Sequence, residues 1–296
     1  MNIKIGCHVS IAGGVWKAPK NAADLGCETF QIFTRSPQGG SVPPLTEEIV
    51  SQFKSEMQKY GLKDFVIHAP YIINFGSAKA STFHGSINII RTELERGSLL
   101  GASYVMFHPG SFKDLGEVEG MKQVKAGLKE VLEGYKGTTK LLVEISAGAG
   151  QVVGDTFEEL AELVKTLKKY KGFGGICYDT QHAFASGYDI RTQKVAAETF
   201  KKFNEVVGLE WLRMSHVNDS KPEFASHKDR HEHIGDGHIG KAGFKAFILE
   251  IKNRKLPVLR SFSEGREIGP NTIFPLILET EHDKVIEDIE TLKKLR

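Results

Sequence analysis

The feature that most constrains the fold of this chain is the alternation, along its whole length, of short apolar runs with longer amphipathic segments. The runs are rich in β-branched and aromatic residues, as buried strands are. They are IKIGCHV (3–9), TFQIFT (29–34), DFVIHA (64–69), SYVMFHP (103–109), KLLVEIS (140–146), GGICYDT (174–180), WLRMSHV (211–217) and PLILET (275–280). Eight strands, each followed by a helical segment or a long loop, predict an α/β fold of the (β/α)8, or TIM, barrel type.

The segments between these runs have the periodicity of amphipathic helices. In TFEELAELVKTLKKY, the apolar residues that fall on one helical face are Phe157, Leu160, Ala161, Val164 and Leu167. Thr156 and Glu159 have the spacing of a capping box at the start of this helix. An open, doubly wound parallel sheet is the alternative architecture for the same alternation. Because the chain shows no linker, low-complexity tract or sequence repeat, we expect residues 1–296 to form a single domain.

The composition argues against several classes of protein. No apolar run approaches the ~18 residues of a membrane span, and MNIKIGCHVS lacks the apolar region of a secretory signal. The formal net charge of +2 neither favours nor excludes nucleic-acid binding, because a local basic face suffices for it. Cys7, Cys27 and Cys177 are widely spaced and odd in number, so we predict no disulfide framework. We therefore expect a cytoplasmic protein with no membrane partner.

The third to eighth apolar runs all end at or next to a residue type that binds metal ions. In chain order these residues are His68, His108, Glu144, Asp179, His216 and Glu279. The carboxyl ends of the strands meet on one face of a barrel, where catalytic groups lie. So many imidazoles and carboxylates facing one another would repel or remain unpaired without a cation. The pattern therefore predicts a metal centre on that face.

A second concentration of such residues lies at positions 216–238, which contain five of the eleven histidines and three aspartates. Asp229 and His231 are two residues apart, so an extended segment points both the same way. His182 lies three residues beyond Asp179, within reach of a second metal ion. The candidate ligands number five His, two Asp and two Glu, too many for one tetrahedral zinc and suited to three ions that share carboxylates. The histidines that we expect at the surface or supporting the ligands are His227, His233 and His238.

The segment SAGAGQVVGDTFEEL, which follows the fifth run, is similar to the Gly-rich turn of dinucleotide-binding folds. Its glycines read G-x-G-x-x-x-G, which is one residue too long for that fingerprint, and the preceding run ends in Glu144. We interpret the segment as a tight loop that lets a substrate backbone approach the metal ions.

Six motifs along the chain have the residues and order of one known family. They are HVSIAGG (8–14), HAPYIINFGS (68–77), HPGS (108–111), GICYDTQHAFASGYD (175–189), HVNDSKPEFASHKDRHEHIGDGHIG (216–240) and PLILET. By these motifs the chain resembles endonuclease IV, the zinc-dependent family 2 of apurinic/apyrimidinic endonucleases. The motifs occur in order over nearly the whole chain, and their spaced agreement is highly specific.

The resemblance implies three zinc ions per chain. One would be held by His68, His108 and Glu144, a second by Glu144, Asp179, His216 and Glu279, and a third by His182, Asp229 and His231. The implied reaction is hydrolysis of the phosphodiester bond 5′ to an abasic site, which leaves a 3′-hydroxyl and a 5′-deoxyribose phosphate. A metal-bound hydroxide would be the nucleophile, since shared zinc lowers the pKa of water toward ~7. Glu144 would bridge two ions and orient the nucleophile, and Glu279 would accept its proton.

The implied partner is double-stranded DNA with abasic sites or 3′-blocked ends, bound by a monomer that associates with the nucleoid when it acts. Recognition of a missing base rests on shape, so side chains must fill the gap in the stack. Tyr71 is the best-placed aromatic for this role, Arg35 is predicted to contact phosphate, and Gln38 to reach into the stack. In the loop after the second apolar run the family usually carries bulky residues, whereas this chain has two glycines, Gly39 and Gly40. The family also commonly has an Asn-rich turn at the position of residues 145–148.

Alternatives remain for both a residue and the function. The segment 252–274 is longer than is usual in the family before the last strand, so Glu264 and Glu267 are alternatives to Glu279. A single-metal sugar isomerase or epimerase of the xylose isomerase-like barrels would need only four of these ligands. This quartet is Glu144, Asp179, His216 and Glu279. A DNA-binding protein with structural zinc is disfavoured, because structural zinc sites are closed and generally contain cysteine.

Overall fold

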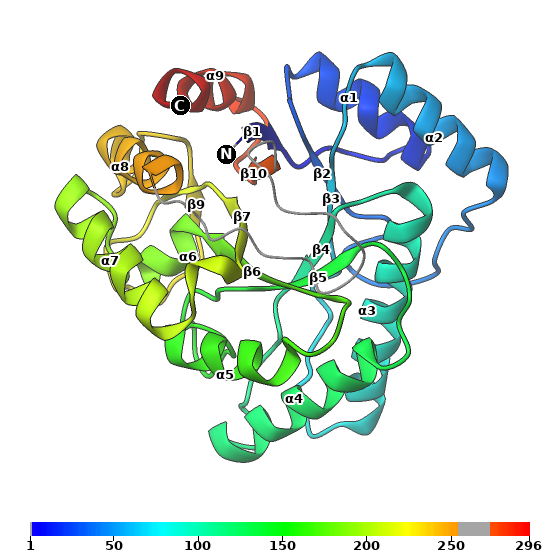
Figure 1. The fold of residues 1–296 in the computed structure, drawn as a ribbon, viewed down its shortest axis with the longest axis horizontal. Helices are drawn as coiled ribbons and strands as arrows, with labels where there is room; N and C mark the ends of the chain where they lie inside the picture. The colour runs from blue at the N-terminus through cyan, green and yellow to red at the C-terminus, as the bar shows by residue number, and fades with distance from the viewer. Residues whose placement is uncertain (1, 254–272) are drawn as a thin grey trace.

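The computed structural model describes residues 2–253 and 273–296, and its centre is a parallel sheet. Within this part of the chain the sheet has eight strands in the order β1-β10-β7-β6-β5-β4-β3-β2 (Figure 1). The strands are β1 (Asn2–Cys7), β2 (Gln31–Ile32), β3 (Val66–His68), β4 (Tyr104–Phe107), β5 (Lys140–Glu144), β6 (Phe173–Asp179), β7 (Leu212–His216) and β10 (Ile273–Leu278). Each falls within or overlaps one of the eight predicted runs, and all seven pairings are parallel.

The two edge strands of this sheet meet and close it into a barrel. His8 forms a parallel bridge with Gln31, and the backbone N–H of Val9 donates to the Gln31 carbonyl at 2.9 Å. The first and second strands are therefore joined just beyond the end of β1. This contact confirms the predicted TIM barrel and excludes the open doubly wound sheet, whose edge strands do not meet.

Helices surround the strands, as Figure 1 shows. In the described residues they are α1 (Ala18–Asp24), α2 (Glu47–Lys59), α3 (Ala80–Leu100), α4 (Glu117–Leu132), α5 (Phe157–Leu167), α6 (Thr180–Ala185), α7 (Gln193–Val206), α8 (Gly240–Asn253) and α9 (Val285–Leu295). Short 3-10 turns span Val15–Lys17 and Leu209–Trp211, and a small antiparallel ribbon pairs β8 (Asp219–Ser220) with β9 (His231–Glu232). No helix of the described part is long and apolar enough to cross a membrane.

Helix α5 buries the apolar face that its sequence pattern predicts. Its predicted apolar face packs into the core, with Leu163 buried as well. Thr156 caps the helix by accepting from the Glu159 N–H at 3.2 Å. The predicted capping box is nevertheless only half formed, because the Glu159 carboxylate accepts from Gly154 N–H at 2.6 Å instead of returning to Thr156. The N–H of Gly154, in the Gly-rich turn before the helix, is therefore the donor to this carboxylate in place of the Thr156 N–H.

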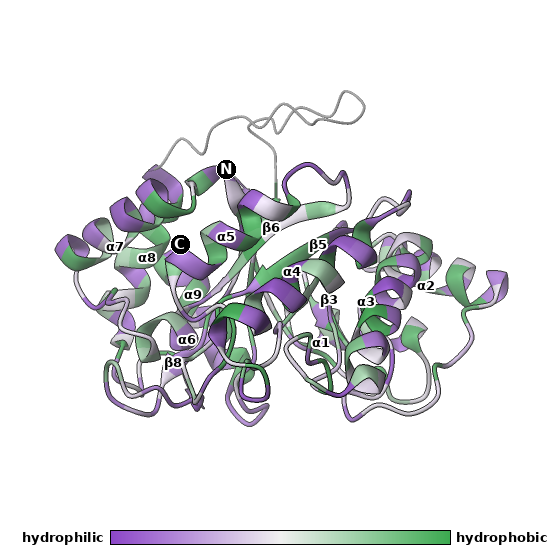
Figure 2. Cartoon of the chain, turned by 90° about the horizontal axis from the view of Figure 1, so that it is seen from below, coloured by the Kyte–Doolittle hydropathy of each residue, from purple (hydrophilic) through white to green (hydrophobic). Residues whose placement is uncertain are grey.

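The apolar core has two layers. A large layer lies between the sheet and the surrounding helices, whose ribbons alternate between hydrophilic and hydrophobic residues (Figure 2). A small cluster with one residue from each of six strands comprises Val66, Met106, Leu142, Cys177, Met214 and Ile277. The three cysteines are buried and free, with 3.6 Å between the sulfur atoms of Cys7 and Cys27.

Candidate metal centre

The small barrel cluster explains why the candidate ligands gather at one place. Each of its six residues lies two positions before a candidate ligand: Val66 before His68, Met106 before His108, Leu142 before Glu144, Cys177 before Asp179, Met214 before His216, and Ile277 before Glu279. Side chains two positions apart on a strand point to the same side. The apolar cluster therefore places the ligands one layer above itself, at the carboxyl ends of the strands.

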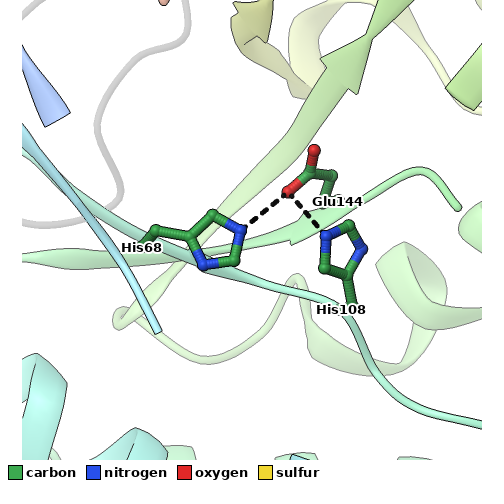
Figure 3. Close-up of side chains that lie close together, drawn as sticks. All are labelled: His68, His108 and Glu144. Atoms are coloured by element: carbon green, nitrogen blue, oxygen red, sulfur yellow. Dashed lines mark ion pairs between the residues drawn. The ribbon is translucent and has the colours of Figure 1, made fainter. Parts of the chain in front are cut away.

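Glu144 stands at the middle of this layer and is fully buried. One carboxylate oxygen, Oε2, lies 3.6 Å from Nε2 of His68 and 3.5 Å from Nε2 of His108, and Figure 3 shows both rings turned toward it. The other oxygen, Oε1, lies 2.6 Å from Nδ1 of His216. The two oxygens thus face two different groups of ligands, which is the geometry of a bridging carboxylate.

The remaining candidates form two further groups, of which one shares Glu144 with the first group and the other shares Asp179 with the second. The ligand atoms of Glu144, Asp179, His216 and Glu279 all lie within 4.8 Å of one another, as do those of Asp179, His182 and His231. Oδ1 of Asp229 lies 3.4 Å from Nε2 of both His182 and His231. Asp179 also caps α6 by accepting from the His182 N–H at 2.7 Å, which holds His182 beside it. All nine predicted ligands therefore meet at one site.

The hydrogen bonds of the imidazoles indicate that a cation belongs here. Nδ1 of His68 lies 2.6 Å from the Ala69 carbonyl, and Nδ1 of His182 lies 3.0 Å from the Ile145 carbonyl. A carbonyl only accepts, so these nitrogens carry protons, and Nε2 of each ring faces a carboxylate oxygen, of Glu144 and of Asp229 respectively. Buried atoms without a hydrogen-bond partner include Oε2 of Glu144 and Nε2 of His182 and His231. A shared metal ion would satisfy these atoms, and the nitrogen and oxygen donors fit zinc.

The electrostatics of the site couple buried carboxylates to buried imidazoles. Burial acts to raise the pKa of Glu144, but the imidazoles of His216 and His108 outweigh it and hold the pKa well below its usual range. Burial is outweighed in the same way at Glu279, where His216 and His68 lower the pKa to about 2. Burial lowers the pKa of His108 to about 4, whereas at His182 and His216 burial is outweighed by neighbouring acidic groups, which hold the pKa well above its usual range. The carboxylates are therefore ionised, as metal binding requires, and a metal ion bound here would displace protons from His182 and His216.

The DNA-contact candidates lie at different depths. Tyr71 is 62% exposed, with its ring 5.3 Å from that of His68, and Gln38 is exposed in the neighbouring loop. Arg35 differs from expectation: it is only 8% exposed, and its Nη2 donates to the Gly40 carbonyl at 2.8 Å. The predicted phosphate contact of Arg35 therefore has no support in the geometry, since the side chain is used to fold its own loop.

A cavity of about 380 Å³ lies between the exposed residues around Tyr71 and the candidate metal ligands. Tyr71, Ile72 and Asn74 line one part of it, and His108, His182 and Asp229 line another. Ile72 is 46% exposed, and the sequence analysis did not identify it as a cavity residue. Its position directly after Tyr71 was the one available signal. The cavity gives a substrate access to the candidate metal centre.

Two amides that support the ligands were also missed. Asn218 donates from Nδ2 to Asp179 at 2.7 Å and accepts through Oδ1 from the Glu279 N–H at 2.8 Å, so it links two ligands. Its place in HVND, two residues after His216, was a usable signal. Gln31 contacts both Glu279 and His216, and nothing in its local sequence indicated this.

The other sequence alternatives also have outcomes. His233 is buried and paired with Asp288 at 2.8 Å, whereas His227 and His238 are exposed, as expected of residues that are not ligands. Glu279 follows β10 directly and reaches the site. Its two alternatives, Glu264 and Glu267, lie outside the described residues.

The barrel and its ligand layer define the class of protein. The family described as "Xylose isomerase-like TIM barrel" matches residues 19–295. A "Probable endonuclease 4" of Nitrosopumilus maritimus is 36% identical over 296 residues, which cover 99% of both chains. An "Apurinic-apyrimidinic endonuclease" of Caenorhabditis elegans is 38% identical over 88% of this chain and 66% of that one. The crystal structure of endonuclease IV from Thermus thermophilus has a TM-score of 0.80 and 31% identity, covering 99% of this chain and 98% of that chain. The chain belongs to the endonuclease IV family.

Proposed function

We propose that this protein is a zinc-dependent DNA repair endonuclease that hydrolyses the phosphodiester bond 5′ to abasic sites, leaving a 3′-hydroxyl and a 5′-deoxyribose phosphate. The observation that supports the proposal is the layer of nine candidate ligands around the buried carboxylate of Glu144. The relatives named endonuclease 4 and apurinic-apyrimidinic endonuclease support the nuclease activity. Removal of 3′-blocking groups needs the same phosphodiester chemistry, and we include it in the proposal.

The residues divide into three proposed zinc sites. They are His68, His108 and Glu144; then Glu144, Asp179, His216 and Glu279; then His182, Asp229 and His231. Zinc bound there would lower the pKa of a water molecule and neutralise charge on the scissile phosphate and leaving oxygen. This arrangement needs no serine or cysteine nucleophile.

The protein's own side chains supply orientation and proton transfer. Glu144 would hold two ligand groups at a fixed separation, because Oε2 faces His68 and His108 while Oε1 is hydrogen-bonded to His216. Glu279, whose Oε2 lies 3.3 Å from His216, is the carboxylate that we propose accepts the proton of the attacking water. Tyr71 and the cavity beside it would hold the sugar-phosphate backbone at the lesion. We propose that the protein acts as a monomer, in the cytoplasm at the nucleoid where such DNA occurs.

A single-metal sugar isomerase is the second candidate, because the quartet of Glu144, Asp179, His216 and Glu279 is complete. It leaves the other five ligands without a role. In particular, it does not account for the buried, unpartnered Nε2 atoms of His182 and His231. The geometry therefore favours the trinuclear centre.

The test is incubation with a duplex that contains one abasic site, followed by analysis of the new termini. We expect a 3′-hydroxyl and a 5′-deoxyribose phosphate, with an intact duplex of the same sequence as control. Asp229→Asn should reduce incision while leaving the quartet intact. An absence of incision together with ketose–aldose exchange on sugars would instead establish the isomerase.

A further inference from the structure

The side chain of Gln31 is fully buried between ligands that are distant in sequence. It comes from β2, where its backbone pairs with β3 and also forms the bridge to His8 that closes the barrel. Its amide Nε2 lies 2.6 Å from Oε1 of Glu279 and 3.1 Å from Nδ1 of His8, and its amide oxygen lies 2.7 Å from Nε2 of His216. A residue so placed influences two ligands at once.

The direction of each hydrogen bond follows from chemistry. An ionised carboxylate only accepts, so the Gln31 NH₂ group must face Glu279 and its carbonyl oxygen must face His216. That oxygen can only accept, so Nε2 of His216 carries a proton. The other ring nitrogen, Nδ1, lies 2.6 Å from the ionised carboxylate of Glu144 and donates to it. A metal ion bound by these carboxylates would displace the Nδ1 proton and bind the lone pair there, while Gln31 keeps the proton at Nε2. Burial lowers the pKa of His8 to about 4, so its neutral ring can accept the second amide hydrogen.

Nδ1 of His216 points at the proposed second zinc site. Nδ1 lies 2.6 Å from Glu144 Oε1, 3.3 Å from Glu279 Oε2 and 3.9 Å from Asp179 Oδ2. These are the other three members of the quartet. The amide of Gln31 also holds Glu279 by its far oxygen, which leaves Oε2 turned toward the same point.

We infer that Gln31 is a positioning residue that selects the Nε2–H tautomer of His216 and the orientation of Glu279, and so preforms the quartet site for its metal ion. The inference rests on the proposed metal centre but not on the identity of the substrate. Partners that fix the tautomer and orientation of metal ligands commonly contribute ~10–100-fold to metal affinity. Gln31 reaches only the quartet, so the other two sites should be nearly independent of it.

Gln31→Met is the sharpest test, because methionine keeps the length and unbranched shape but cannot donate to Glu279. Gln31→Glu is the second variant; it keeps an acceptor for His216 but faces Glu279 with a like charge. Gln123→Met is the matched control, since Gln123 also donates two hydrogen bonds, to the Phe75 and Ser77 carbonyls on the outer side of the barrel.

The full-length proteins are challenged as purified with increasing chelator, and retained zinc is counted. Gln31→Met should lose one zinc per chain at ~10–100-fold lower chelator than the unaltered protein and the Gln123 control, while the remaining zinc stays bound. Equal retention in all three proteins would overturn the inference. Failure of the unaltered protein to retain any zinc would count against the proposed centre itself.

A second measurement does not depend on counting metal ions. Nitrogen-15 NMR of the imidazoles, recorded on the zinc-saturated full-length protein, reports which ring nitrogen carries the proton. We expect His216 to keep a slowly exchanging proton at Nε2 in the unaltered protein, and this proton to exchange faster or to move in Gln31→Met. A signal that shows Nδ1–H in the zinc-saturated unaltered protein, or an unchanged spectrum in the variant, would remove the positioning role.

Discussion

At the scale of single residues, the site contains two glutamates, Glu144 and Glu279, whose carboxylates differ in their surroundings. Glu144 is fully buried at the centre and lies close to two ligand groups, whereas Glu279 is 13% exposed and lies beside His216. Replacement of Glu144 would therefore disturb the whole metal layer. Glu279 offers a cleaner separation of chemistry from binding.

We expect Glu279→Gln to reduce incision of abasic DNA by at least ~10²-fold, the usual scale for loss of a positioned acid–base group. The variant retains the size of the side chain and an oxygen that can accept, but it loses the charge and the basicity. Affinity for abasic duplex should change much less, as measured by equilibrium binding beside single-turnover cleavage. Normal cleavage by this variant would refute the role of Glu279 as proton acceptor.

Tyr71 is the residue from which we expect lesion recognition. Its ring is exposed and packs edge-on against that of Phe33, with 5.5 Å between the ring centroids. This packing fixes the orientation of an exposed aromatic ring that a substrate can contact. Tyr71→Ala should weaken binding to abasic duplex by ~1–3 kcal/mol, the scale of one lost aromatic stacking contact. Tyr71→Phe should retain most of the affinity. Equal losses on abasic and intact duplexes would show that Tyr71 does not read the lesion.

At the scale of elements, the loop between β8 and β9 is under backbone strain. Ala225 and His227 both have left-handed backbone angles, with φ of 54° and 53°. They are held there because the N–H of Ala225 donates to the Phe184 carbonyl and that of His227 to the Ala185 carbonyl, each at 3.1 Å. These bonds attach the loop to α6, whose first turn contains His182. The same two hydrogen bonds therefore hold the loop that contains Asp229, which with His182 and His231 forms the proposed third zinc site.

Ala225→Gly should increase the free energy of unfolding by ~0.5–1 kcal/mol, because glycine adopts positive φ without the clash of a Cβ atom. Ala126→Gly is the control: Ala126 is exposed in α4, and glycine there should reduce stability by ~1 kcal/mol. Urea unfolding of the three proteins measures both effects. A loss of stability in Ala225→Gly would mean that the loop is not strained at this residue.

At the scale of the whole molecule, the metal centre joins strands from both halves of the chain. His68 and His108 come from early strands, whereas His216 and Glu279 come from the last two strands of the barrel. Ions bound between them link the strands in the folded state alone. Such binding stabilises the fold by an amount that grows with metal affinity.

We therefore expect purified protein to contain about three metal ions per chain, predominantly zinc, and chelation to lower the melting temperature. Elemental analysis and thermal unfolding before and after chelation test this. His182→Asn should reduce the count by one, because it removes a ligand of one proposed site only. His233→Asn should leave the count unchanged, since His233 is paired with Asp288 away from the ligands. A count near one would support the isomerase.

Much of this architecture is determined locally and was therefore accessible from the sequence alone. Apolar residues two positions before six of the nine ligands, such as Leu142 before Glu144, indicate both the strand and the side of the sheet on which the ligand lies. The helical period of 157–167 likewise specifies the buried face of α5. The barrel, its ligand layer and the nine ligand candidates follow from these short-range patterns, because the period of a side-chain pattern is a property of the local backbone.

Tertiary structure decided whatever depends on partners distant in the chain. Arg35 has the sequence context of a solvent-exposed loop, yet the loop folds back and buries it against the Gly40 carbonyl. Glu159 has the spacing of a capping box, yet the turn at Gly154 takes its carboxylate. Gln31 meets Glu279 across 248 positions of sequence only because the barrel closes between its first two strands. The bonding of a buried polar group depends on which donors and acceptors the complete fold brings to it, and local periodicity carries no information about them.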